Sequence, residues 1–180
     1  MSCLLPKPAG SSPFTSATKG KLTETANPAK LEAPVAGDGG LFSTTSDYIR
    51  FLQMFLNDGR GKGATLLSKE SIQLMTKNEI GSVIVQTQKT TNALRSEDFP
   101  IGAGRDKFGF GFQIATSNKE NPNLRAPGSY TWAGIFNTHF WVDPKRQIAG
   151  VILMQVLPFY DDGCMKVYQD FEAAIGKNLK

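Results

Sequence analysis

The chain has 180 residues, 40% of them apolar and 20% charged, and carries a formal net charge of +4 from 20 Lys and Arg against 16 Asp and Glu. This length suits one domain with its own core, and Cys3 and Cys164 are too few for a disulfide framework or a cysteine metal cluster. The basic residues are scattered and no nucleic-acid-binding module is found, so nucleic acid is not an expected partner. The longest apolar run, residues 148–157, is shorter than the roughly 18 residues of a membrane span, and residues 1–7 lack the apolar stretch of a secretory signal. We expect a soluble protein of unknown compartment, with no metal and no cofactor.

The first 35 residues are rich in Pro, Ser, Thr, Lys and Ala and show neither a helical nor a strand period. Residues 6–16 are typical of an extended or disordered loop, and residues 19–34 of a long irregular connection. Order is expected to begin at the glycine cluster of residues 37–40. We therefore divide the chain into an irregular N-terminal segment, residues 1–35, and a domain, residues 36–180.

Two helices are predicted next. Thr45 or Ser46 can cap the first one, residues 57–59 (Asn-Asp-Gly) stop it, and apolar residues at i, i+3, i+4 and i+7 form its inward stripe: Tyr48, Phe51, Leu52 and Phe55. The second helix follows Ser68 and is expected to turn three side chains inward: Ile72, Leu74 and Met75.

From Phe108 the apolar period changes to two, which predicts strands over residues 108–112, 129–135, 138–143 and 148–156. The polar turn between the last two predicts an antiparallel hairpin. A last helix, about residues 161–177, has the inward stripe Met165, Tyr168, Phe171 (or Glu172) and Ile175. Helices, then strands, then a helix predict an α+β fold, an antiparallel sheet flanked by helices.

Six segments resemble segments of the serine β-lactamase-like family and follow one another in the family's order. The family includes class C β-lactamases, penicillin-binding-protein-like carboxypeptidases and related esterases. The segments, which span about residues 36–159, are Gly39–Thr44, Asp47–Met54, Leu66–Met75, Phe108–Phe112, Gly128–Gly134 and Asn137–Pro144. The fold that this resemblance implies is part of a β-lactamase/transpeptidase-like fold.

The resemblance implies an acyl-enzyme mechanism. Family members use a serine nucleophile with a lysine base in an S-x-x-K motif, a tyrosine in a Y-x-N motif, and a strand motif that is K-[ST]-G or W-x-G. Here Trp132, Ala133 and Gly134 are similar to the W-x-G form. By similarity, these residues and Ile135 are expected to bind substrate, with the Ile135 amide supplying an oxyanion donor, a contribution of about 2.7–4 kcal/mol where such donors were removed.

The strand motif here has no lysine to attract a carboxylate, so a neutral ester or amide is the expected small-molecule substrate. Taken without the other segments, Trp132–Gly134 is more typical of an ordinary strand with a packed tryptophan, and the other five segments reverse that preference.

No catalytic residue is secure. No Y-x-N precedes the glycine cluster, and Ser16 and Lys19, the one S-x-x-K match ahead of it, fall in a segment without an apolar period to bury them. His139, the only histidine, has no G-x-S-x-G elbow to pair with and is expected to pack on the surface or sheet. Tyr130 is interpreted as a strand aromatic and Cys164 as a small buried residue.

Two adjacent carboxylates, Asp161 and Asp162, are better explained as capping charges at a helix start than as an acid–base pair.

Two hypotheses follow from the resemblance. The chain is the C-terminal portion of a β-lactamase-related serine hydrolase and is catalytically incomplete by itself. Alternatively, it is a non-catalytic remnant of that fold that binds a ligand or partner. Because the last strand would expose an apolar edge, an oligomer or a complementing chain is expected.

Overall fold

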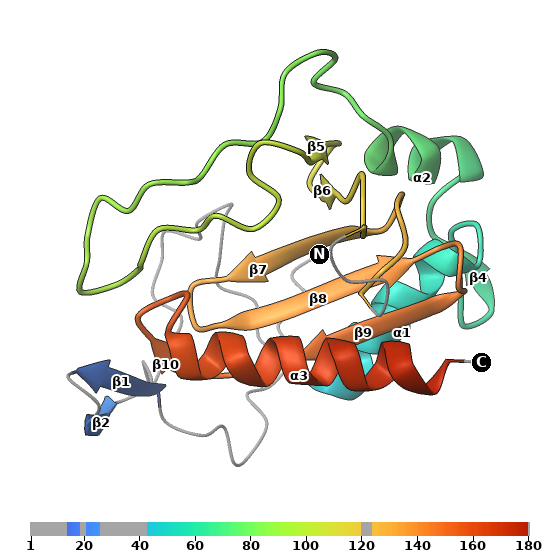
Figure 1. The fold of residues 1–180 in the computed structure, drawn as a ribbon. Helices are drawn as coiled ribbons and strands as arrows, with labels where there is room; N and C mark the ends of the chain where they lie inside the picture. The colour runs from blue at the N-terminus through green and yellow to red at the C-terminus, as the bar shows by residue number, and fades with distance from the viewer. Residues whose placement is uncertain (1–13, 19–20, 26–42, 120–123, 180) are drawn as a thin grey trace, which may run out of the picture.

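The computed structural model describes residues 43–119 and 124–179, together with the backbone of residues 14–18 and 21–25. A five-stranded sheet carries helix α3 on one face and helix α1 on the other, and two smaller sheets complete the described part of the chain (Figure 1). This arrangement confirms the α+β fold class that the sequence predicts.

The five-stranded sheet has the order β5-β6-β7-β8-β9, and every neighbouring pair is antiparallel. Its strands are β5 (Lys107–Phe108), β6 (Gln113–Ile114), β7 (Tyr130–Gly134), β8 (Thr138–Asp143) and β9 (Ile148–Ile152). Strands β8 and β9 pair from His139 opposite Ile152 to Asp143 opposite Ile148, which confirms the predicted hairpin.

The prediction of a single strand over residues 108–112 is wrong, because the chain makes a turn within these residues. The amide of Gly109 donates to the carbonyl of Phe112, and Gly111 has a φ of +99°. Gly109 also lies so close to α2 that an added Cβ would come within 2.3 Å of the Met75 carbonyl oxygen. The alternation of aromatic and glycine residues thus marks a tight turn between β5 and β6, where two glycines permit the bend and the close approach.

The prediction of one strand over residues 148–156 is also wrong, because the structure has two separate strands there. Strand β9 ends at Ile152, and β10 (Val156–Leu157) leaves the sheet to pair in parallel with β1. Backbone and side-chain hydrogen bonds from the β7–β8 turn hold β10 in its new direction: Val156 donates to the Phe136 carbonyl, and Asn137 Nδ2 donates to the Val156 carbonyl.

The N-cap of helix α1 (Thr45–Leu56) is Thr44, one residue before the two predicted caps, Thr45 and Ser46. The hydroxyl of Thr44 accepts a hydrogen bond from the amide of Asp47. Leu52 and Phe55 are buried against the sheet as predicted, and so is Met54, which the predicted stripe omitted. Phe51 remains 44% exposed, contrary to the prediction.

Helix α2 (Lys69–Thr76) is capped by Ser68, whose hydroxyl accepts from the Ser71 amide. A small hairpin of β3 (Arg60–Gly61) and β4 (Ala64–Thr65) connects it to α1. Ile72 is buried and Met75 packs partly against the core, but Leu74 is 45% exposed, so its predicted inward orientation is wrong.

Helix α3 (Asp162–Asn178) starts at Asp161, whose carboxylate accepts from the Cys164 amide, as the capping interpretation predicts. Its buried side chains are Cys164, Met165, Tyr168 and Glu172. Phe171 and Glu172 were the two alternatives for the third inward position of this helix. Glu172 is the more buried of the two, because its carboxylate forms an ion pair with Arg125.

The N-terminal segment is not irregular throughout, which corrects the expectation for residues 1–35. Strands β1 (Phe14–Thr18) and β2 (Lys21–Thr25) pair with each other antiparallel, and β1 also pairs with β10. The sequence shows no alternation there. Strand β1 pairs with β2 in a local hairpin and with β10, some 140 residues away, and no local pattern reveals this second pairing.

No strand among the described residues pairs with the outer edge of β9, while α1 packs on one face through Ala149 and Val151. In the same part of the chain, no helix is long and apolar enough to cross a membrane.

Candidate functional site

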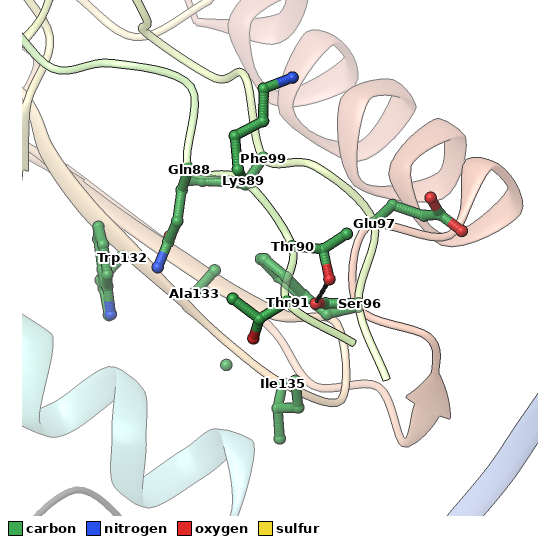
Figure 2. A pocket seen from close by; sticks show the side chains of 12 residues that line it. Gln88, Lys89, Thr90, Thr91, Ser96, Glu97, Phe99, Trp132, Ala133 and Ile135 are labelled. Carbon is green, nitrogen blue, oxygen red and sulfur yellow. Dashed lines mark hydrogen bonds between the residues drawn. The ribbon is translucent and has the colours of Figure 1, made fainter. Parts of the chain in front are cut away.

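The four residues expected to bind substrate line one cavity of about 560 Å³. Two segments form most of its lining, the loop of residues 88–99 and the end of β7 with the following turn (Figure 2). Phe159, two residues after β10, completes it. The lining residues are Gln88, Lys89, Thr90, Thr91, Ser96, Glu97, Phe99, Trp132, Ala133, Gly134, Ile135 and Phe159.

Trp132 forms an apolar wall of this cavity. Its ring makes edge contacts with Phe108 at 5.1 Å and Phe99 at 6.5 Å between centroids, and the residue remains 36% exposed. Phe99 in turn contacts Phe159 at 5.2 Å, which extends the aromatic surface around the cavity.

Gly134 leaves the strand open beside this wall. A Cβ built on it would meet only the Thr138 Cβ, at 3.7 Å, an ordinary contact distance. The backbone of Gly134 and Ile135 is therefore accessible to a ligand without a side chain in the way, as expected for a strand that lies along a substrate.

The loop of residues 88–99 is a narrow hairpin closed at its base by reciprocal backbone hydrogen bonds between Gln88 and Phe99, at 2.9 and 3.0 Å. Within it, the hydroxyls of Thr90 and Ser96 are 2.6 Å apart (Figure 2). The Thr90 amide donates to the Asp98 carboxylate. These bonds hold a wall of neutral polar side chains opposite β7.

Charge in the cavity lining is balanced, with one lysine and one glutamate. Lys89 donates to Asp98 at 2.6 Å, and this bond lowers the pKa of the Asp98 carboxyl. Both Lys89 and Glu97 extend away from Trp132 and Ile135 (Figure 2). The inner surface is therefore aromatic and neutral polar.

Asn137 joins the two sides of the cavity. It is fully buried, with a φ of +61°, and its side-chain amide donates to the Val156 and Pro158 carbonyls while its oxygen accepts from the Tyr160 amide. The turn that carries Ile135 is thus bonded to the segment that carries Phe159.

The two catalytic candidates fall largely outside the described part of the structure. Ser16 lies on β1, where its backbone pairs with Leu157 and Thr23, and its side chain lies outside the described part of the structure; Lys19 is outside the described residues altogether. Among the hydrogen bonds of the described side chains, none joins a serine hydroxyl to a lysine amine. The hydroxyl of Ser96, which lines the cavity, has the Thr90 hydroxyl as its partner among the described residues.

The other titratable candidates are structural. His139 is buried on β8 and stacked on Tyr168 at 4.3 Å, and burial together with the Arg125 charge lowers its pKa to about 4. Burial raises the pKa of the Cys164 thiol to about 11 and raises that of Tyr130. Within the described residues, no three His, Cys, Asp or Glu side chains gather as metal ligands.

The loop of residues 88–99 is the part of the site that the sequence did not predict, although it supplies seven of the twelve lining residues. Its sequence signal is weak: turn-forming residues lie inside it, but the pairing of Gln88 with Phe99 leaves no apolar period.

Comparison with known proteins identifies curated relatives, one of which is named a methylbutanoyltransferase. Protein Rv1367c of Mycobacterium tuberculosis is 32% identical over 126 residues, covering 67% of this chain and 29% of that protein. ML-236A carboxylate methylbutanoyltransferase of Penicillium citrinum is 26% identical over 152 residues, 80% of this chain and 34% of that protein. The chain thus spans about a third of the length of the curated relatives it matches.

The structure of simvastatin synthase (LovD) of Aspergillus terreus superposes with a TM-score of 0.75 at 22% identity, over 93% of this chain and 42% of that one. This likeness shows that the chain has the β-lactamase-like fold. The sequence model of the family described as Beta-lactamase matches residues 5–175. Because that match covers most of the 180 residues, the chain belongs to the β-lactamase family.

Proposed function

We propose that this chain provides the substrate-binding strand and acyl cavity of a β-lactamase-related serine enzyme that hydrolyses or transfers acyl groups of neutral esters or amides. The observation that carries the proposal is that Trp132, Ala133, Gly134 and Ile135 line one cavity of about 560 Å³. That volume lies within the range of small-molecule sites, which are concave, mostly apolar and equipped with a few polar groups.

The strand supports the reaction chemistry. An acyl-transfer transition state develops negative charge on the carbonyl oxygen, and a backbone N–H held on a rigid strand stabilises that charge without reorganisation. In this proposal the Ile135 amide is the donor, Gly134 allows the scissile carbonyl to approach, and Trp132 packs against the acyl chain. Asn137 keeps the turn in place.

The cavity chemistry favours an uncharged substrate. The aromatic surface of Phe99, Trp132 and Phe159 offers apolar contact, and the hydroxyls of the loop offer neutral hydrogen bonds. The one lining cation, Lys89, is bonded to Asp98, so no free cation is available from the described lining to hold a carboxylate. The names of two relatives, a methylbutanoyltransferase and a simvastatin synthase, agree with acyl transfer as the reaction class.

We further propose that this chain alone does not turn substrate over, because no described serine hydroxyl is hydrogen-bonded to a lysine amine and the one S-x-x-K match, Ser16 and Lys19, falls in a segment without an apolar period to bury it. The nucleophile and base would come from a further polypeptide, for which the outer edge of β9 is the proposed docking strand. The alternative hypothesis is a non-catalytic remnant that binds ligand.

Binding is tested with butyranilide, a neutral amide that does not react, in an NMR titration of backbone amides. The expected shifts concentrate on Trp132–Ile135 and residues 88–99, and sodium butyrate binds at least tenfold more weakly. Trp132→Ala and Gly134→Ala are expected to weaken binding at least tenfold, whereas Phe110→Ala, an exposed aromatic outside the cavity, leaves it unchanged. Shifts elsewhere, or equal effects of all three variants, would contradict the proposal.

Catalysis is tested with a serine-directed fluorophosphonate probe on the chain and on its Ser16→Ala variant. The proposal expects no labelling of either. Labelling that Ser16→Ala abolishes would instead make Ser16 the nucleophile and the chain a complete enzyme. A reading frame immediately upstream that encodes S-x-x-K and Y-x-N is expected for a split enzyme, and its absence would favour the remnant.

A further inference from the structure

A second, much smaller cavity lies directly behind the wall of the acyl cavity. Its volume is about 10 Å³, and Phe99, Trp132 and Ala133 line both cavities. Its remaining lining is largely polar and includes Arg125 and His139. This volume is about the lower limit that accommodates one water molecule.

Arg125 reaches this cavity with one unpaired donor. Its Nε donates to Glu172 Oε1 at 2.9 Å, and its Nη2 donates to Glu172 Oε2 and to the Tyr168 hydroxyl. The Arg125 amide donates to the same carboxylate, so backbone and side chain are both fixed. Nη1 is buried and has no hydrogen-bond partner among the described residues.

His139 contributes the second unpaired atom. Its ring is held by stacking on Tyr168, with 20° between the planes, and by its position on β8 opposite Ala133. Nε2 is buried and likewise has no partner among the described residues. Since the large majority of buried side-chain polar atoms in proteins are hydrogen-bonded, two such atoms on residues that line one cavity point to a shared ligand.

The two groups are complementary to a molecule that is both acceptor and donor. A guanidinium only donates, while the neutral imidazole has one nitrogen that accepts. Burial and the Arg125 charge lower the pKa of His139 to about 4, so the ring is neutral at pH 7 and one of its nitrogens can accept a hydrogen bond. Thr131 also lines the cavity; its hydroxyl donates to the Phe140 carbonyl and keeps lone pairs free to accept.

We propose that this cavity binds a single water molecule, which accepts a hydrogen bond from Arg125 Nη1 and donates one to His139 Nε2, and that His139 is therefore the Nδ1–H tautomer. The water links the Arg125–Glu172 pair, on the α3 side of the sheet, to β8 beneath Ala133. This inference does not depend on the proposed acyl-transfer function, because it involves only groups behind the cavity wall.

His139 is the only histidine in the 180 residues, so its imidazole signals in a ¹⁵N-labelled sample are unambiguous. At pH 7 the expected spectrum shows a protonated Nδ1 and an unprotonated Nε2, with rotating-frame cross-peaks from a long-lived water to the ring protons. A crystal structure of the whole chain at about 1.5 Å is expected to show one water within about 3.2 Å of both nitrogens.

The matched control is Gln155→Met. Gln155 Oε1 is also buried and unpaired, but Gln155 does not line this cavity, so the variant is expected to leave the tautomer and the water cross-peaks unchanged. A protonated Nε2, a cavity without water density, or loss of the cross-peaks in Gln155→Met would overturn the proposal.

Discussion

Lowering the pH from 7 to 5 is expected to destabilise this protein through one residue, His139. Its pKa in the folded chain is about 4, lowered from an ordinary value of 6.5 by burial and by the nearby Arg125 charge. The groups packed around its ring, Tyr168 on α3 and the Arg125–Glu172 pair, supply no carboxylate in direct contact that would favour the imidazolium. The unfolded chain therefore takes up a proton at a higher pH than the folded chain does.

The sign and size of the effect follow from this difference in pKa. The stabilisation is fully present above pH 6.5 and declines as the pH falls from about 6.5 to about 4. The difference of roughly 2.5 between the pKa values of the unfolded and folded chains corresponds to about 3 kcal/mol of stability. Of this, about 2 kcal/mol is lost between pH 7 and pH 5. Measurement at pH 5 limits the contribution of exposed carboxylates such as Glu70 and Asp98, whose pKa values are lowered and which protonate mainly below that pH.

Urea unfolding at pH 7 and pH 5 measures the free energy of unfolding for the wild-type chain and for His139→Phe, which keeps an aromatic ring on Tyr168. The wild type is expected to lose about 2 kcal/mol and the variant less than about 0.5 kcal/mol, with similar m-values. Equal losses in the two proteins would refute the reasoning. If the variant does not fold, an NMR titration of the single histidine decides instead, with a midpoint near 4 expected and one near 6.5 excluding the effect.

Glu172→Gln is expected to lower the free energy of unfolding by about 3–5 kcal/mol, because it leaves the buried guanidinium without its counter-charge. The matched control Asp170→Asn, which breaks an exposed pair on the same helix, costs less than about 1 kcal/mol in the same urea titration. Gly150→Ala is expected to destabilise by about 1–3 kcal/mol, since its Cβ would lie 2.3 Å from the Trp141 ring, whereas Gly134→Ala leaves the melting temperature nearly unchanged. Comparable melting temperatures for the two alanine variants would show that β9 shifts to accommodate the methyl group.

Local sequence patterns determined the elements whose contacts are near in the chain. Leu52 and Phe55 on α1, and Met165 and Tyr168 on α3, followed from helical spacing because each apolar stripe must face a core. The β8–β9 hairpin followed from two alternating segments joined by a short polar turn, and the resemblance of Trp132–Gly134 to a family strand motif led to residues that line one cavity.

Tertiary structure decided the features that depend on distant partners. Whether Phe51 or Met54 is buried depends on how α1 lies against β8 and β9, and the division of residues 148–156 into two strands depends on hydrogen bonds from the β7–β8 turn. The pairing of β1 with β10, some 140 residues away, likewise has no local signal in the chain.

The site divides in the same way. The strand beside the cavity was singled out by the resemblance of Trp132–Gly134 to a family motif, since the local pattern alone is typical of an ordinary strand with a packed tryptophan. The loop of residues 88–99 and the burial of Arg125 with Glu172 were decided by the tertiary fold. Hydrogen bonds and ion pairs between segments 47 residues apart leave no periodicity in the chain, because their energy depends on a geometry that only the folded backbone supplies.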